Sequence, residues 1–238
     1  MRDKTQSEVE IQRQYYRDTA GTYNDKCVHE KDEHYFALSF LVAALDYIGA
    51  ESVLDIGSGT GRAVTYMKQR RPDIQIVGVE PVDELRSIGY ANGLSHSDII
   101  DGDATQLQFT DNQFDVVCEF GVLHHIRKPE IAVAEMLRVA RKAIFISDSN
   151  NFGQGSFLAR SVKQFLNLMG LWGIADFIKT KGRGYSISEG DGLFYSYSVY
   201  NNYNLIKKNC KSIHVLNTFP AGINPYRSSG HVALLAMK

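Results

Sequence analysis

Apolar residues lie along the chain in short runs that alternate with segments of helical spacing. The runs are rich in β-branched and aromatic residues and predict strands at 52–56, 75–80, 97–101, 114–119 and 142–147. Apolar residues three or four positions apart predict helices between these strands, at 62–70, 83–91 and 129–139. Strands that alternate with helices form a parallel sheet covered on both faces. The pattern therefore predicts an α/β fold with a doubly wound, mostly parallel sheet.

The two ends of the chain extend this pattern. An apolar segment at 35–48 has helical spacing and ends at Gly49, which suits a helix C-terminus, so we expect it to cover one face of the sheet. Two further strands are predicted at 211–219 and 231–236. Since no helix separates them, we expect them to be antiparallel. The sheet should then have seven strands and a C-terminal hairpin, with the last strand between the fifth and the sixth.

The pattern changes after the fifth predicted strand. Large apolar side chains recur there at helical spacing: Phe157, Leu158, Val162, Phe165, Leu166, Met169 and Trp172. Such a stripe usually packs in a core, and its position after the fifth strand predicts a helical lid over a substrate mouth. A membrane-surface helix is the alternative, which the small number of accompanying basic residues disfavours.

Length and charge narrow the possibilities further. We expect the 238 residues to form a single domain, 1–238, divided into an N-terminal arm and helix, a core, a lid and C-terminal strands at 1–50, 51–148, 149–205 and 206–238. The net charge of −1 predicts no nucleic-acid or membrane partner. The polar N-terminus and the lack of a spanning apolar run favour a cytoplasmic protein. The oligomeric state stays open between monomer and homodimer. The three cysteines show no C-x-x-C spacing, which argues against a disulfide framework or a zinc site.

Three glycines at alternate positions follow the first predicted strand. Gly57, Gly59 and Gly61 come just after Asp55 and directly before the helix at 62–70. Glycines leave the backbone bare for a ligand, and a helix N-terminus offers unpaired amides. The loop therefore predicts a site for a carboxylate or phosphate, although a tight turn without a ligand has the same pattern. Its G-x-G-x-G spacing differs from the dinucleotide fingerprint G-x-G-x-x-G.

Carboxylates follow the predicted strands in sequence. Asp55, Glu80, Asp103 and Glu119 all lie at or just after a strand end. Glu80 comes about twenty positions after the glycine loop, where nucleotide-binding folds place an acid on ribose hydroxyls. An acid facing water at a strand end is the alternative. Because ligands of such sheets bind beyond the carboxyl ends of the strands, the four acids predict one shared site.

The order of these motifs resembles the class I S-adenosylmethionine-dependent methyltransferases, in the branch that acts on small molecules. The resemblance rests on the glycine loop, Glu80, Gly102-Asp103-Ala104, F-D-x-V from Phe114 and the following L-H-H, and it covers 53–148. It implies S-adenosylmethionine as donor and S-adenosylhomocysteine (SAH) as product. The donor-binding residues that it implies are Asp55, Gly57, Ser58, Gly59, Gly61, Glu80, Pro81, Asp103, Ala104, Glu119 and Phe120. In this family the loop holds methionine, the acid after the second strand holds ribose, and Asp-Ala brackets adenine.

The N-terminal segment matches the family in part. Ala20 and Tyr23-Asn24 fit an A-x-x-Y-[DN] arm that folds over the cofactor, and a helix on the sheet edge is the alternative. The histidines and acids at 29–34 predict a helix start more than a metal site. Aromatic side chains with a polar tip suit a substrate pocket, beside a cationic loop at 179–184. We predict substrate contacts from Tyr15, Tyr23, His29, Tyr195 and Tyr197, although a solvated loop is the alternative around 195–203.

Methyl transfer to a hydroxyl needs a base, because the acceptor must lose its proton. His124 is the first candidate and His125 the second, since the loop after the fourth strand faces the methyl donor. The equal alternative for both histidines is a structural role, in which their ring nitrogens are hydrogen-bonded within the loop. We predict no metal. The resulting hypothesis is O-methylation of a small metabolite, such as a sugar or another anionic intermediate. The alternatives are N-methylation of a small amine and a non-catalytic protein that binds S-adenosylmethionine.

Overall fold

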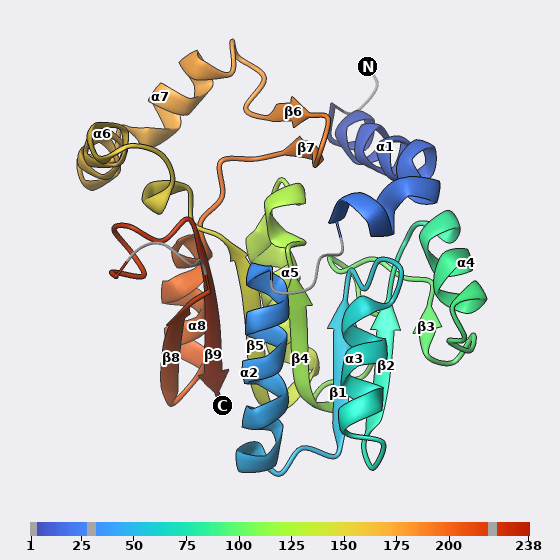
Figure 1. Ribbon diagram of the computed structural model, residues 1–238. Coiled ribbons are helices and arrows are strands. Elements are labelled where there is room, and N and C mark those ends of the chain that lie inside the picture. The colour runs from blue at the N-terminus through green and yellow to red at the C-terminus, as the bar shows by residue number, and fades with distance from the viewer. Residues whose placement is uncertain (1–3, 28–31, 219–222) are drawn as a thin grey trace.

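The computed structural model describes residues 4–27, 32–218 and 223–238, and its centre is a seven-stranded sheet (Figure 1). The strand order is β3-β2-β1-β4-β5-β9-β8. The strands are β1 (Ser52–Ile56), β2 (Gln75–Val79), β3 (Ile99–Ile100), β4 (Phe114–Phe120), β5 (Ala140–Ser149), β8 (Ser212–Asn217) and β9 (His231–Met237). The first five are parallel, and β9 runs antiparallel between β5 and β8. The predicted fold class, including the C-terminal hairpin, is confirmed.

Helices cover both faces of this sheet. They are α1 (Lys4–Cys27), α2 (Glu33–Ile48), α3 (Arg62–Arg70), α4 (Asp83–Ala91), α5 (Pro129–Val139), α6 (Phe157–Leu168), α7 (Trp172–Lys179) and α8 (Tyr203–Asn209). Side chains alternate along each strand, so neighbours enter different cores. Val53 packs with α2 and α3, whereas Leu54 packs with α5 and α8. The sheet is therefore buried on both faces, and its carboxyl ends are left to carry the site.

The strongly periodic elements match their predicted bounds, and the weaker ones differ. Strand β1 and helices α3, α4 and α5 begin and end as predicted. Strand β3 contains only Ile99–Ile100, because Asp98 turns back to accept a hydrogen bond from the amide of Ser95. The N-terminal segment that carries Ala20 and Tyr23 is part of a long helix, since α1 runs without a break from Lys4 to Cys27. Helix α8 crosses the expected boundary at 205 between lid and strands.

Three segments lie beyond the carboxyl ends of the parallel strands, at the top of Figure 1. Helix α1 packs on α4 and on the hairpin of β6 (Ser186–Ser188) and β7 (Gly192–Phe194). The sequence analysis did not predict this hairpin, since each strand is only three residues long. Helices α6 and α7 form the predicted lid. The expectation that the lid stripe packs in a core is wrong, because Phe157 and Leu158 are 78% and 72% exposed.

None of the helices in the described part of the chain is both long and apolar enough to cross a membrane.

Candidate active site

A cavity of about 460 Å³ lies beyond the carboxyl ends of β1, β2 and β4. Its wall combines the glycine loop, the strand-end acids and helix α1. The lining includes Gln12, Arg13, Tyr16, Tyr23, Gly57, Gly59, Glu80, Pro81, Asp103, Ala104, Phe120, Val122, His125 and Tyr195. Most of the predicted donor-binding residues are thus brought together around one space, which we call the first cavity.

Two positions of the loop require glycine, because their φ angles are positive and neighbouring side chains leave little room for a Cβ atom. Gly57 has φ +67°, and a Cβ there would lie 2.4 Å from Cγ2 of Val122. Gly59 has φ +57°, and a Cβ there would lie 3.2 Å from the hydroxyl oxygen of Tyr23. Both φ values lie in the region that favours glycine. The loop therefore presents bare backbone to the first cavity.

Glu80 is the best-placed acid on this wall. Its Oε2 accepts a hydrogen bond from the amide of Gly59 at 3.0 Å, and its Oε1 accepts one from the amide of Val82 at 2.9 Å. A carboxylate has about four acceptor positions, so each oxygen can still accept from a ligand hydroxyl. Burial raises the pKa of Glu80 to about 7, against the opposing effect of the two amides. A ligand that donates hydrogen bonds would favour the ionised form.

Asp103 is held at the far side of the first cavity by two neighbours. Its Oδ2 accepts from Nη2 of Arg13 on α1 at 3.0 Å, and its Oδ1 accepts from the amide of Thr105 at 2.8 Å. Ala104, which follows it, also lines the cavity. Helix α1 therefore contacts the acid that the sequence assigns to adenine.

Four of the predicted donor-binding residues do not line the first cavity: Asp55, Ser58, Gly61 and Glu119. The Oγ of Ser58 faces Gly78 on β2 and has no hydrogen-bond partner among the described residues. Gly61 is the N-cap of α3, at φ +84°. Glu119 accepts hydrogen bonds from the amides of Val122 and Ser147, so it holds the loop that carries other lining residues.

Asp55 is buried beside Cys118, whose Sγ lies 3.8 Å from Asp55 Oδ1. Burial raises the pKa of the Asp55 carboxyl to about 7. Asp55 thus lies behind the glycine loop and does not line the space that a ligand would fill.

A second cavity, of about 820 Å³, lies beneath the lid. Helices α6 and α7 contribute Arg160, Asp176 and Lys179 to its wall, and Thr180 directly follows α7 there. The opposite side contributes His34, His124, Tyr197 and His231. Tyr195 lines both cavities. The two spaces are therefore neighbours, separated by the loop after β4 and by the β6–β7 hairpin.

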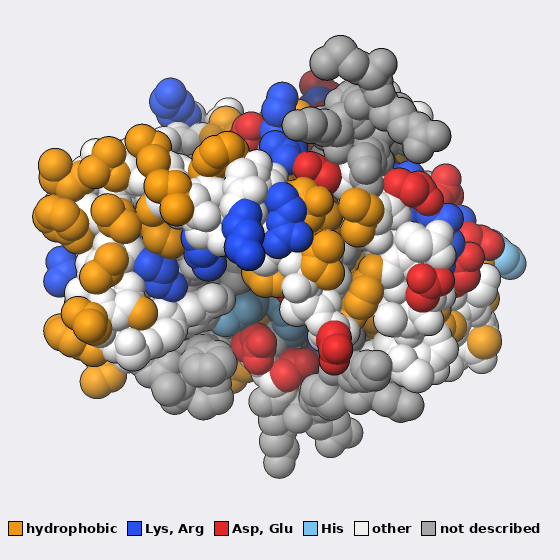
Figure 2. Space-filling model, turned by 90° about the horizontal axis from the view of Figure 1, so that it is seen from above, with side chains coloured by type: hydrophobic (Ala, Val, Ile, Leu, Met, Phe, Trp, Pro, Cys, Tyr) orange, Lys and Arg blue, Asp and Glu red, His pale blue; other side chains and the backbone are white. Residues whose placement is uncertain are grey.

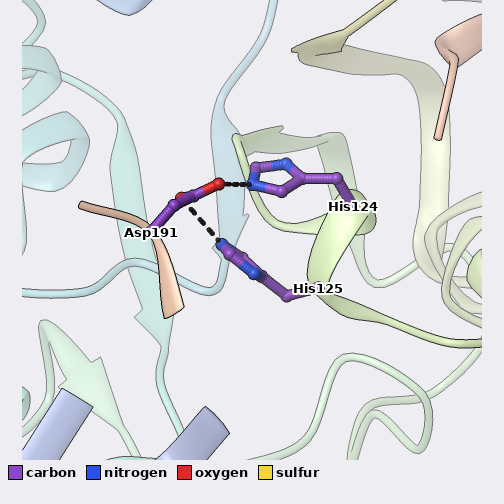
Figure 3. A group of neighbouring side chains, drawn as sticks. All are labelled: His124, His125 and Asp191. Atoms are coloured by element: carbon purple, nitrogen blue, oxygen red, sulfur yellow. Dashed lines mark ion pairs between the residues drawn. The ribbon is translucent and has the colours of Figure 1, made fainter. Parts of the chain in front are cut away.

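His124, His125 and Asp191 meet at this boundary (Figure 3). The histidines lie on a 3-10 turn, Leu123–His125, and Asp191 lies in the turn of the hairpin. Asp191 Oδ2 is 3.3 Å from Nε2 of His124, and Oδ1 is 3.5 Å from Nε2 of His125. Gly192 has φ +67° and lies against α1, where a Cβ would meet Gln12 and Tyr15. This close packing of the hairpin on α1 positions the carboxylate of Asp191.

His124 lies between two carboxylates. Its Nδ1 is 2.7 Å from Oδ1 of the buried Asp148 at the end of β5, and its Nε2 faces Asp191. Burial alone would lower the pKa of His124, but Asp148 and Asp191 together raise it well above its ordinary value. The two carboxylates therefore favour the imidazolium form of His124, which suits it to donate hydrogen bonds to an anion more than to accept a proton.

His125 has a different set of partners. Its Nδ1 lies 2.7 Å from the carbonyl oxygen of Leu193, which can only accept, and 3.1 Å from Nε2 of Gln12. With the proton on Nδ1, Nε2 is the acceptor of the neutral ring. The hydroxyl of Tyr16 lies 3.0 Å from that Nε2. Burial raises the pKa of Tyr16 well above its ordinary value, so the phenol keeps its proton and donates it to the hydrogen bond. His125 thus presents an accepting nitrogen at the wall of the first cavity.

The predicted substrate residues separate into three groups. Tyr23 and Tyr195 line the first cavity, and Tyr195 and Tyr197 line the second. Tyr15 lines neither, and its hydroxyl donates to the carbonyl oxygen of Glu189 at 2.7 Å. His29 lies outside the described residues.

The sequence analysis missed three contributors: Asp191, Asp148 and Gln12. Gln12 hydrogen-bonds the amide of Leu193 and the carbonyl oxygen of Asp191, so it ties α1 to the hairpin. The glycines on both sides of Asp191 were the only available signal, because the contacts link distant parts of the chain.

The three residues His124, His125 and Asp191 also have the donor set of a cation site. One ligand atom from each lies within 4.8 Å of the others. Two imidazole nitrogens and a carboxylate suit a divalent transition metal. The expectation of a metal-free enzyme stays a prediction.

Comparison with known proteins matches residues 54–146 to the family described as "Methyltransferase domain". A phosphatidylethanolamine N-methyltransferase of Cereibacter sphaeroides is 28% identical over 138 residues, which cover 50% of this chain and 61% of that protein. A demethylmenaquinone methyltransferase of Renibacterium salmoninarum is 33% identical over 101 residues, which cover 42% of this chain and 41% of that protein. The chain thus matches less than two thirds of the length of either relative.

The fold agrees over nearly the whole chain. The crystal structure of magnesium protoporphyrin IX methyltransferase from Synechocystis PCC 6803, with bound SAH, has a TM-score of 0.63 at 16% identity, covering 97% of this chain and 99% of that one. The predicted resemblance is confirmed by the matched domain. Residues 54–146 are therefore the core of a methyltransferase domain with S-adenosylmethionine as its donor, and the chain has the fold of the class I methyltransferases.

Proposed function

We propose that the protein methylates a hydroxyl group of a small molecule held in the second cavity, with S-adenosylmethionine in the first. The observation that carries this proposal is the contact between the two cavities. Tyr195 lines both, and His125 on the first reaches Asp191 on the second. A donor and an acceptor on either side of this boundary would meet at a base.

The residues of the first cavity fit the donor. The bare backbone at Gly57 and Gly59 suits the methionine part, and Glu80 has acceptor positions left for two ribose hydroxyls. Asp103 and Ala104 suit the adenine amine and ring. When bound, the donor supplies an electrophilic methyl group on a sulfonium, and transfer leaves SAH. What remains for the protein is to align the acceptor and to take its proton.

His125 is the better base of the two histidines, which reverses the order expected from the sequence. Its Nε2 accepts a hydrogen bond from Tyr16, and the acceptor hydroxyl would replace Tyr16 there. As the new C–O bond forms, the O–H proton would pass to Nε2, and the C–S electron pair would stay on the leaving sulfur. Asp191 then faces the protonated ring and stabilises its charge.

The second cavity favours an acceptor that carries negative charge. Asp148 and Asp191 favour the cationic form of His124, and Arg160 and Lys179 also line the wall. Glu33, Asp176 and Asp191 are the acids on the same wall, and Asp191 is already paired with the histidines. A phosphate or carboxylate on the acceptor would therefore find charge-assisted donors beneath the lid.

N-methylation of an amine is the second candidate function. The Cereibacter sphaeroides relative is by name a phosphatidylethanolamine N-methyltransferase, so its acceptor atom is a nitrogen. An amine needs a base only to the extent that it is protonated, and His125 would matter less.

The test is a methylation assay with S-adenosylmethionine and a panel of anionic alcohols, phenols and amines, read by mass spectrometry. We expect a methyl ether as product. The variant His125→Gln should lower turnover by about 10² to 10⁴, the usual contribution of a general base. His96→Gln is the matched control, since His96 is exposed and stacks on Tyr90 away from both cavities.

Exclusive methylation of amines would favour the second candidate. SAH binding without turnover on any acceptor would favour a non-catalytic protein. Activity that disappears on chelation and returns with a divalent metal would instead make the two histidines and Asp191 ligands of a cation.

A further inference from the structure

The lid exposes an apolar surface that has no partner in the described chain. Neither of its helices, both described along their whole length, contains a buried residue. More than half of the large exposed apolar side chains of the described protein lie here: Phe157, Leu158, Val162, Phe165, Leu168, Met169, Leu171, Ile174, Phe177 and Ile178. In Figure 2, orange side chains gather on the lid side of the molecule, with white and blue atoms between them. Monomeric proteins rarely leave so large an apolar patch uncovered.

The orientation of the lid helices is inverted relative to an ordinary surface helix. Polar side chains face the protein: Gln164 donates to the carbonyl oxygens of Phe152 and Arg227, and Lys163 donates to that of Asn151. The apolar side chains face outward. An amphipathic helix normally buries its apolar face. These hydrogen bonds hold the apolar face toward solvent, so the exposure is part of how the lid is attached.

Charge on the lid has the opposite sign to the rest of the chain. Residues 157–183 contain five cations, Arg160, Lys163, Lys179, Lys181 and Arg183, and one acid, Asp176. The segment therefore carries +4, and since the whole chain carries −1, the remaining residues carry −5. Lys179, Lys181 and Arg183 are exposed. The expectation of no membrane partner came from the net charge of the whole chain. That net charge does not show that the lid segment is positive and the remaining residues negative.

These features distinguish between two possible partners of this surface, a second copy of the chain and a membrane. A second copy would bring the exposed Lys179, Lys181 and Arg183 of one lid against those of the other, so the two lids would repel each other. An anionic bilayer accepts apolar side chains at the depth of its acyl chains without a complementary shape, and its headgroups attract cations at the edge of the patch. Apolar area and positive charge on one exposed face are the combination that such a surface binds.

We propose that the outer face of α6 and α7 docks on an anionic membrane surface, and that the acceptor reaches the second cavity from that membrane. The same helices line the cavity through Arg160, Asp176 and Lys179. A headgroup leaving the bilayer would therefore meet Arg160 and Lys179 directly beneath the lid. The delivery of the acceptor rests on the function proposed above, whereas docking does not.

The test is vesicle flotation of the full chain without donor or acceptor. We expect the protein to float with vesicles that contain phosphatidylglycerol, less with vesicles of phosphatidylcholine alone, and less at high salt because screening weakens the attraction. Leu168→Asp should weaken binding at least about tenfold, since it places a charge where an apolar side chain would enter the lipid. Tyr47→Asp on α2 is the matched control, because Tyr47 is 86% exposed and Leu168 84%.

A second pair of variants tests the charge. Lys179→Glu with Lys181→Glu should weaken binding to the anionic vesicles about tenfold or more, at roughly 1 kcal/mol for each cation near the surface. Lys207→Glu with Lys208→Glu on α8 makes the same change in net charge at exposed positions away from the lid, and should bind like the wild type.

Absence of vesicle binding by a wild-type protein that still binds SAH in calorimetry would overturn the docking proposal. A dimer in light scattering that Leu168→Asp converts to a monomer would overturn it in favour of an interface between copies. Equal loss of binding in a lid variant and in its control would also contradict it. Because flotation needs no turnover and calorimetry reports only the first cavity, failure of docking and failure of the proposed methyl transfer are distinguishable.

Discussion

The two cavities of this protein are built in different ways. The wall of the first comes mainly from strand ends and the turns that follow them, and Glu80 is held there by amides of its own turn and of the glycine loop. The wall of the second comes from the lid, the β6–β7 hairpin and the loops around them. The lid helices on that wall have no buried residue over their described length, whereas every residue of β1 is buried.

This difference has a physical basis. The donor is the same for all enzymes of the family, and the rigid carboxyl ends of a parallel sheet hold its polar groups at fixed spacing. The acceptor side is assembled from surface segments that can vary without disturbing the core. Substitutions in one half should therefore change one binding step and leave the other nearly intact.

The largest expected effect comes from a substitution on the acceptor side, in the second cavity. Asp191→Asn should lower turnover by about 10², because it removes the carboxylate that faces both histidines; a carboxylate that orients a buried catalytic imidazole is worth up to ~10⁴. Affinity for SAH, measured by calorimetry, should change less than about twofold, since the hydrogen bonds of Glu80 are untouched. Equal losses in turnover and in SAH affinity would show that the two halves are one unit.

Glu80→Gln tests the donor side. The loss of charge-assisted hydrogen bonds to ribose should cost about 1.5–3 kcal/mol, or roughly 10- to 150-fold in SAH affinity. Glu84→Gln is the control, since Glu84 is exposed on the neighbouring helix α4. Unchanged calorimetric affinity in the Glu80 variant would remove Glu80 from ribose binding.

The pH dependence of the donor side follows from the same residue. Burial raises the pKa of Glu80 from 4.5 to about 7, so the unliganded protein should lose stability as pH rises through that window. Donor binding favours the ionised carboxylate, so SAH affinity should fall by about tenfold for each pH unit below 7. Thermal denaturation at several pH values should show a stabilisation by SAH that grows as pH rises. Glu80→Gln should make that stabilisation independent of pH.

The smallest expected effect concerns the contact between α1 and the donor site. Arg13→Ala removes the ion pair with Asp103, in which the side chains are 37% and 45% exposed. Exposed pairs contribute about 0–1 kcal/mol, so SAH affinity should fall by only about twofold. Arg17→Ala, which removes a similar pair with Glu10 on the same helix, should have no effect in calorimetry. A tenfold loss for Arg13→Ala would make α1 a principal donor-binding element.

The two halves also differ in how far the sequence predicts them. Strong periodicity located β1, α3, α4 and α5, and the acids after the strands indicated the donor cavity, because both signals are local. Orientation was harder, since nothing around Ser58 reveals that its hydroxyl faces Gly78. Asp191 pairs with histidines far away in sequence, and no spacing rule encodes that contact. The apolar stripe of the lid correctly predicted helices, but periodicity does not show whether an apolar helix face packs on the core or faces solvent.

The tie between α1 and the hairpin has a consequence for the order of events in a catalytic cycle. Helix α1 forms one wall of the first cavity, and its Gln12 holds the amide of Leu193 and the carbonyl oxygen of Asp191. Moving the helix aside to exchange the donor would release the carboxylate that faces both histidines. We therefore expect a compulsory-order mechanism, in which the donor enters first and its spent form leaves last.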